Sequence, residues 1–191
     1  MGMVEYLAKR ERTRQHILET AFELFEAQGY DRTTTAQIAT TAGVSEMTLF
    51  RHFASKDRLL LDDPYDPVIA QAVAAQPPEL PALTRATAGV RAAWRTVPEP
   101  AEEAVRRRMR IAARTPGLTG AIRANTRATE TAIARALTDT GADPTVAQIA
   151  AAATLAALME SLTAWAVADA PCPLDDAIRL ALDVLDDTVP R

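Results

Sequence analysis

Residues 33–57 read TTTAQIATTAGVSEMTLFRHFASKD, and this stretch decides the fold. The hydroxyl of Thr34 can accept hydrogen bonds from the free N–H groups at the start of a helix that runs to about Ala42. Gly43 follows, and glycine is the residue that most readily adopts the left-handed conformation at a helix end. Ser45 can then cap a second helix. The stretch therefore predicts two short helices joined by a tight glycine turn.

The second of these helices has an inner and an outer face. Leu49 and Phe53 are four residues apart, so they share one face, which we expect to point into the core. The first turn is then free to meet base edges in the major groove of DNA, as the recognition helix of a helix-turn-helix does. The residues on the other faces are Glu46, Met47, Thr48, Arg51 and His52.

The composition agrees with a small helical protein. The chain has 191 residues, enough to bury a core and to form one large or two modest domains. Aliphatic residues dominate, alanine is abundant and aromatic residues make up only 5%, which favours helices over sheets. We expect an all-α fold with a three-helix head and a C-terminal bundle of about five or six helices.

The sequence shows no sign of export. The N-terminal residues lack the apolar core of a signal peptide, and the most apolar segment, residues 143–168, is interrupted by Gln148 and Glu160. We therefore expect a cytoplasmic protein that does not enter the membrane. The one cysteine, Cys172, excludes an internal disulfide framework and offers no zinc site.

The net charge of −4 at first argues against a nucleic-acid partner. Its distribution weakens that objection, because residues 1–58 contain eight basic and eight acidic residues and the whole deficit lies beyond them. Lys9, Arg10, Arg12 and Arg14 cluster at the front of this neutral segment. Global charge affects solubility and encounter rates and does not decide whether a binding site exists.

Proline and glycine divide the chain into helices. An apolar stripe predicts a first helix from about residue 9 to residue 28, and a short helix begins at Lys56 after the helix-turn-helix. We divide the chain into a DNA-binding head, residues 1–57, and a second domain, residues 58–191. The expected later helices cover about residues 67–76, 82–97, 101–114, 144–168 and 173–188, with a break at 98–100. After a further break at 115–117, another helix continues to about residue 138.

The first third of the chain contains a longer pattern in one register. Its parts are T-R at 13–14, I-L at 17–18, A-x-x-L-F at 21–25, G-Y-D at 29–31, T-T at 33–34, I-A at 38–39, A-G-V-S at 42–45, T-L-F-R-H-F at 48–53 and S-K-D at 55–57. With this pattern the sequence resembles the TetR family of bacterial transcriptional regulators. The segment DDPYDPVIA, residues 62–70, further resembles a TetR branch found beside mycofactocin genes, where acyl-CoA effectors are suspected.

The resemblance to TetR regulators implies a general architecture and a mode of action. It implies an all-helical homodimer with an N-terminal operator-binding domain and a C-terminal domain that binds an effector and forms the dimer. It also implies that ligand binding moves the two heads apart from the spacing of the operator.

The resemblance assigns DNA contacts position by position. Glu46 and Met47 lie where the family varies to read different operators, and Phe50 occupies an aromatic position, often tyrosine, that reaches the sugar-phosphate backbone. Thr34 could instead be a helix cap alone, as could Ser45. The expected DNA-contacting residues are Thr34, Thr35, Gln37, Ser45, Glu46, Met47, Thr48, Phe50, Arg51, His52 and Lys56.

The second domain carries weaker signals for an effector site. Arg107, Arg110 and Arg114 fall on one helix face, where guanidinium groups can bind a carboxylate or phosphate in a bidentate fork. A solvated face paired with nearby glutamates is the alternative. Trp94 and Trp165 complete the candidate set. The scarcity of other aromatic residues favours an acyl or carboxylate ligand over a flat cationic one.

The last two long helices have a surplus of apolar surface, which favours dimerisation. Alanines in the first of them allow a close approach of helices, and two such helices from each subunit would form a four-helix bundle. An ordinary core within one chain is the alternative. The expected interface residues are Ala152, Ala156, Met159, Ile178, Leu182 and Leu185.

The sequence offers no catalytic set. Both histidines, His16 and His52, lie in the head, Cys172 is alone, and no glycine-rich phosphate loop or metal-ligand cluster occurs. We therefore predict a ligand-responsive regulator without enzyme activity or cofactor, a repressor that leaves a palindromic operator when a small hydrophobic or anionic effector binds. An architectural or constitutive DNA-binding protein without a small-molecule switch is the alternative.

Overall fold

The computed structural model of the chain describes residues 2–61, 66–96 and 102–187. The expected break at 98–100 lies outside these residues, as do the first four residues of the DDPYDPVIA segment and the last residue of the final expected helix.

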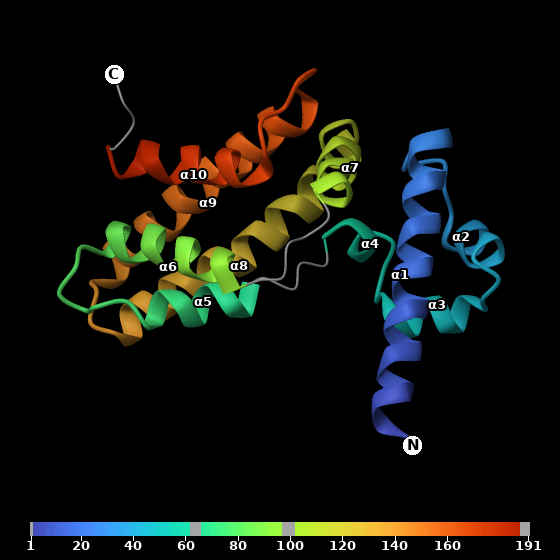
Figure 1. Cartoon of the computed structure of the whole chain (residues 1–191), viewed down its shortest axis with the longest axis horizontal. Helices are drawn as coiled ribbons and strands as arrows, with labels where there is room; N and C mark the ends of the chain where they lie inside the picture. Colours follow the sequence, from blue (N-terminus) through green and yellow to red (C-terminus); the bar gives the residue numbers. More distant parts are fainter. Residues whose placement is uncertain (1, 62–65, 97–101, 188–191) are drawn as a thin grey trace. The chain divides into compact units, whose positions relative to one another are not determined.

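The described residues fold into helices and contain no strand (Figure 1), which confirms the all-α fold class. The helices are α1 (Met3–Gln28), α2 (Thr35–Thr41), α3 (Glu46–His52), α4 (Arg58–Leu61), α5 (Asp66–Ala74), α6 (Ala82–Thr96), α7 (Glu102–Ala113), the 3-10 helix η1 (Pro116–Leu118), α8 (Thr119–Asp139), α9 (Pro144–Val167) and α10 (Leu174–Leu185).

The first helix is longer than expected. It begins at Met3 instead of Lys9, because the intervening residues include Glu5, Leu7 and Ala8, which favour helix, and contain no breaker. Its buried side chains follow the expected stripe from Ile17 onward. α1 thus has a C-terminal half that packs into the protein, whereas the side chains from Glu5 to Arg12 are exposed.

The chain separates into two compact units. The first comprises Met1–Asp62 and Ile111–Ala121, and the second comprises Asp63–Arg110 and Ile122–Arg191. The segment Ile111–Ala121, which the sequence-based division assigns to the second domain, therefore clusters with the head. Gly117 packs against the loop after α1, where a Cβ at this glycine would lie 3.3 Å from Oδ1 of Asp31.

The second unit is built around α9. The length and hydropathy of this helix would be enough to cross a membrane, but the core helix of a globular protein can have the same length and hydropathy. Ala147, Ala151 and Leu155 of α9 lie in the hydrophobic core of this unit. α9 packs chiefly against α10 and α6. Core side chains such as Ile133 and Leu137 place α8 in the same cluster.

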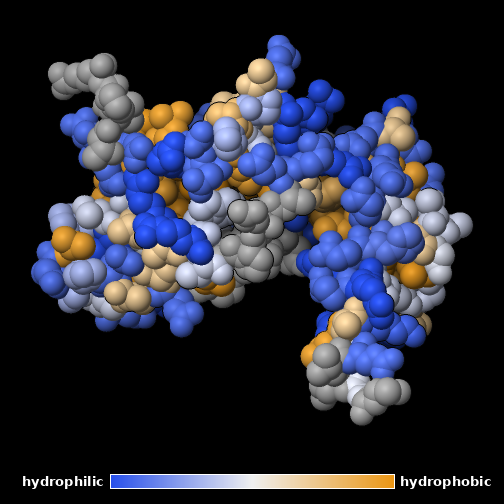
Figure 2. Space-filling view, viewed as in Figure 1, coloured by the Kyte–Doolittle hydropathy of each residue, from blue (hydrophilic) through white to orange (hydrophobic). Residues whose placement is uncertain are grey.

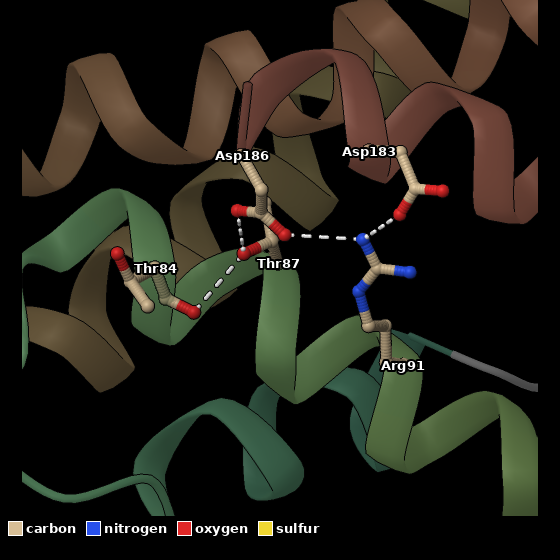
Figure 3. A network of polar contacts seen from close by, with 5 residues as sticks. All are labelled: Thr84, Thr87, Arg91, Asp183 and Asp186. Carbon is tan, nitrogen blue, oxygen red and sulfur yellow. Dashed lines mark hydrogen bonds and ion pairs between the residues drawn. The ribbon is translucent and has the colours of Figure 1, made fainter. Parts of the chain in front are cut away.

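A polar network ties α6 to α10 at the edge of this core (Figure 3). The Arg91 guanidinium lies 2.6 Å from the Asp183 carboxylate and 3.1 Å from that of Asp186. The Thr87 hydroxyl lies 2.8 Å from Asp186 and 3.0 Å from the carbonyl of Thr84. Partial burial opposes the charge on Arg91, but the hydrogen bonds that its guanidinium donates to Asp186 and Asp183 outweigh this effect and raise its pKa.

Candidate nucleic-acid interface

A reciprocal capping box starts α2. The Gln37 backbone N–H donates to the Thr34 hydroxyl at 3.1 Å, and the Thr34 backbone N–H donates to Oε1 of Gln37 at 2.9 Å. The predicted cap at Thr34 is therefore confirmed, and Gln37 proves to be its partner. Both side chains are exposed, so this role leaves open their predicted contacts with DNA.

The turn between α2 and α3 also has the predicted form. Gly43 has a φ of +66°, the left-handed conformation expected from the sequence. The N–H of Val44 donates to the carbonyl of Ala39 at 2.9 Å, and the N–H of Gly43 donates to the carbonyl of Thr40 at 3.1 Å. This is the Schellman arrangement, which satisfies the last carbonyls of a helix. It fixes the direction in which α3 leaves the turn.

The inner and outer faces of α3 are as predicted. Leu49 and Phe53 are buried, and the Ser45 hydroxyl caps the helix by accepting from the Thr48 N–H at 3.1 Å. On the outer face, Met47 is 73% exposed and Phe50 is 46% exposed. Glu46 and Arg51 are exposed as well. α3 therefore presents its outward side chains to solvent while its inner side chains hold it to the head.

Two further predicted contact residues are engaged with neighbours at the start of α3. The Thr35 hydroxyl lies 3.4 Å from Oε2 of Glu46, which links α2 to α3, and the Thr48 hydroxyl lies 2.9 Å from that of Ser45. Thr35 and Thr48 are half-buried. These contacts orient the first turn of α3.

His52 ends α3 in a positively charged environment. Partial burial lowers the pKa of its imidazole, and the nearby Arg10, Arg14 and Arg51 lower it further, against a smaller opposing effect of Glu11. The imidazole is therefore largely neutral near pH 7 in the free protein. A phosphate group nearby would favour its protonated form.

Lys56 is held inside the head. Its ammonium donates to the carbonyls of Tyr30 and Thr33 at 3.0 Å each and lies 4.0 Å from the centroid of the Tyr30 ring. The phenol of Tyr30 in turn donates to Asp57. The sequence assigns Lys56 to phosphate contact and misses this anchoring role, because its partners are backbone carbonyls more than twenty residues away. The phosphate contact stays a prediction.

Comparison with known proteins decides the family. A family model described as bacterial regulatory proteins of the tetR family matches residues 17–62, and the model of the MftR C-terminal domain matches residues 80–190, more than half of the chain. The chain belongs to the TetR family. Its C-terminal domain is of the MftR type.

Individual relatives agree with this assignment. The HTH-type transcriptional regulator TcmR of Streptomyces glaucescens is 51% identical over 53 residues, which are 28% of this chain and 24% of TcmR. The chain spans about a quarter of the length of the curated relatives that it matches.

Solved structures resemble the chain over most of its length. SmeT, the repressor of a Stenotrophomonas maltophilia multidrug efflux pump, has a TM-score of 0.58 at 25% identity, over 90% of this chain and 87% of SmeT. NalD of Pseudomonas aeruginosa has a TM-score of 0.55 at 22% identity, over 96% of this chain and 98% of NalD, and shows the fold alone.

The predicted effector residues of this TetR protein do not gather at one site. Nε of Arg110 donates to the carbonyl of Ala166 at 2.9 Å, in the last turn of α9. The Trp165 side chain is buried, and its indole donates to the carbonyl of Cys172 at 2.7 Å. Arg110 thus satisfies a carbonyl in the last turn of α9, and Trp165 fixes the loop that follows, so both side chains have a structural role.

The other candidates lie apart. The indole of Trp94 donates to Oδ1 of Asp175 at 2.8 Å, beside a hollow of about 260 Å³ between α6 and α10. Arg107 is half-buried on α7. Arg114 directly follows the last residue of α7 and clusters with the first unit, as do the last three residues of that helix. The regular spacing of the arginines hid these differences, because it carries no information about what packs against the helix.

The dimer residues predicted on α10 differ in their burial within the chain, and the dimer contact stays a prediction. Ile178 is 7% exposed and Leu182 is fully buried, so both belong to the core of their own chain. Leu180 and Val184, at 52% and 59% exposed, occupy the outer face instead. The sequence shows apolar residues all around α10, and the burial of each could not be read from that pattern. Leu185 is half-buried.

On α9 the predicted residues lie on or beside an exposed apolar face. Ala156 is exposed, while Ala152 and Met159 are half-buried at its margin. The same face includes Ile149, 63% exposed, and Val167, 56% exposed.

Proposed function

We propose that this TetR protein is a repressor of transcription that leaves a palindromic operator when a small hydrophobic or anionic effector binds. The observation that carries this proposal is the outer face of α3, where Met47, Phe50 and Arg51 are exposed beside a rigidly capped first turn. Side chains held on a fixed helix can read base edges in the major groove. Such a protein works in the cytoplasm and needs no catalytic group.

The division of labour follows the two parts of the chain. The head, residues 1–57, would bind DNA, and residues 58–191 would bind the effector and form the dimer. An architectural DNA-binding protein would share the head and lack the response to a ligand, so release by a ligand separates the two functions.

The chemistry of the second unit supports an effector with acceptor oxygens. Among the described residues, three buried side-chain nitrogen atoms lack a hydrogen-bond acceptor, namely Nε of Arg85, Nε of Arg108 and Nε2 of Gln148. All three lie in the second unit and all are donors. Buried donors are normally paired, so a carboxylate, thioester or phosphate oxygen that reaches one of them would gain affinity.

Arg108 is the best placed of the three for an acyl or carboxylate ligand. It lies on α7 beside Arg107, where the sequence predicts anion binding. Its neighbours Arg106 and Arg110 already donate to the carbonyl of Ala166. Within this run of arginines, Nε of Arg108 is a buried donor without an acceptor, and a ligand oxygen could supply one.

The exposed apolar face of α9 and α10 supports a homodimer. Ile149, Val167, Leu180 and Val184 are each more than half exposed, and an apolar patch of this kind on a protein surface marks an interaction site. A groove of about 710 Å³ runs between the two helices and is bordered by small residues such as Ala157 and Ala164 and by Leu180 and Val184. The matching face of a second copy would fill it.

Operator binding and its release test the proposal. Duplex DNA from the promoter beside the gene of this protein is titrated with the full chain at several salt concentrations, with a scrambled duplex as competitor. Acyl-CoA thioesters and free fatty acids of graded length are then added. Selective binding that one of these ligands reverses supports the repressor.

Two other outcomes contradict it. Equal binding to both duplexes supports the architectural protein, and absence of binding at low salt excludes both functions. The Arg108→Leu variant should bind the operator normally and need at least ~10-fold more ligand for release. Arg135→Leu, at an exposed position of α8, serves as its control.

A further inference from the structure

The N-terminal half of α1 projects from the head. The side chains from Glu5 to Arg12 are all exposed, and from Glu5 onward Ile17 is the first buried residue of the helix. In Figure 1 this end of α1 runs on past α3, and in Figure 2 hydrophilic residues and a few apolar ones lie along it. Packing of the head does not require this part of the helix, so its side chains are available for another contact.

Some of the exposed residues in the N-terminal half of α1 lie on the same side of the helix as its buried residues, in one stripe. At 100° per residue, Tyr6, Arg10 and Arg14 fall within about 40° of one line, and the same line continues through the buried Ile17 and Ala21. The stripe therefore changes from apolar to basic where α1 leaves the core. Because the apolar part holds α1 to the helix-turn-helix, the basic part overhangs the same side of the head.

Contacts with α3 fix where this stripe lies. The guanidinium carbon of Arg14 lies 5.0 Å from the centroid of the Phe53 ring, directly after α3. Arg10 and Arg14 lower the pKa of the His52 imidazole together with Arg51, so positive charge from both helices acts at the C-terminal end of α3. A basic surface thus extends from the recognition helix along α1.

Charge identifies the partner. Residues 5–14 contain four basic and two acidic residues, although the protein as a whole is acidic. An exposed positive segment beside a DNA-reading helix complements the phosphate groups next to the bases that the helix reads. This inference rests on the proposed function. We propose that the α1 stripe, through Arg10, binds the phosphate backbone of the duplex DNA that flanks each operator half-site. The helix α1 then lengthens the operator beyond the base pairs that α3 reads.

A matched pair of variants tests this inference. Arg10→Gln removes one charge from the stripe, while Arg12→Gln removes the same charge 200° away, on the opposite face. Both positions are exposed in the helix, so the fold should be retained, which circular dichroism checks. Each full-length protein is titrated with two duplexes, the footprint from its own promoter with and without several flanking base pairs on each side.

The wild type should bind the long duplex about 10-fold more tightly than the short one, and Arg10→Gln should abolish this difference. The slope of log K against log salt concentration should become less steep by about 2 in Arg10→Gln, because each of the two heads of a dimer loses one phosphate contact. Arg12→Gln should behave as the wild type. Equal losses in both variants, or a wild type indifferent to the flanks, would overturn the inference and leave the proposed function intact. No selective binding of either duplex by the wild type would refute both.

Discussion

Tyr30 joins two segments of the head that are distant in the sequence. Its phenol donates to Asp57, its ring packs 4.9 Å from that of Phe25, and its carbonyl accepts from Lys56. Burial and the neighbouring carboxylate raise the pKa of the phenol, so it keeps its proton and acts as a donor. This one residue therefore fixes the loop after α1 to the segment that precedes α4.

Removing the phenol should destabilise the head. Tyr30→Phe leaves Asp57 without this donor, and we expect the free energy of unfolding to fall by about 1–2 kcal/mol. Tyr6→Phe removes a hydroxyl that is exposed on α1, so its effect should stay within ~0.5 kcal/mol. Urea denaturation of both variants measures the difference. Equal effects would mean that the bond to Asp57 contributes nothing.

His52 should report the charge around α3. Because burial and the three arginines lower its pKa, the imidazole should titrate below 6.5 in the free protein, and its contribution to stability should be lost as the pH falls through the folded value. Arg10→Gln should raise the midpoint, and DNA should raise it further. NMR titration of the ring protons tests this, and a midpoint at or above 6.5 in the free wild type would contradict it.

At the scale of elements, a glycine sets the distance between α5 and α6. A Cβ at Gly89 would lie 2.6 Å from Cα and 2.8 Å from N of Val73, closer than any side chain can approach a backbone. The sequence gives no signal for this contact, because a glycine within a helix looks like an ordinary weak point. The close approach brings Val73 fully into the core.

Alanine at this position should force the two helices apart. We expect Gly89→Ala to lower the free energy of unfolding by about 1–3 kcal/mol, since the clash is with backbone that must shift as a whole. Gly120→Ala, near the start of α8, meets nothing within 4 Å and should be neutral or stabilising by up to ~1 kcal/mol. Thermal unfolding compares the two. Similar melting temperatures would show that α5 can move freely.

Residue patterns within a few positions of each other predicted where the helices begin and end. They predicted less well which side chains of each helix are buried and which are exposed. Caps at Thr34 and Ser45 and the turn at Gly43 were readable because each acts within a few residues. The anchoring of Lys56 and the burial of Leu182 depend on packing between distant segments, which spacing does not encode. The roles of the site residues toward DNA and effector stay predictions.

The exposed face of α9 and α10 should form the dimer. Leu180→Glu combined with Val184→Glu places two charges on this face next to Asp183, and we expect the dissociation constant of the dimer to rise at least ~100-fold. Leu80→Glu, in the loop before α6 and 38% exposed, should leave the dimer intact. Sedimentation velocity measures both. A dimer that survives the double substitution would mean that another surface holds it.

For the whole molecule, the distribution of charge and of unsatisfied groups separates two tasks. Basic and acidic residues balance over residues 1–58, while the remainder carries the net charge of −4. The unsatisfied buried donors lie in the second unit, and the exposed outer face of α3 lies in the first. This separation is what a regulator needs if one part is to read DNA and the other is to sense a small molecule.

Discrimination between DNA sequences by α3 tests this account most directly. We would measure the ratio of the dissociation constants for a scrambled duplex and for the own-promoter duplex, in the wild type and in a variant with Glu46→Ala and Met47→Ala. The wild type should prefer its promoter by at least ~10³-fold. The variant should lose at least ~10-fold of that preference while binding the scrambled duplex at least as well as the wild type, because it lacks the Glu46 carboxylate. An unchanged ratio in the variant, or a wild type that binds both duplexes alike, would contradict the account.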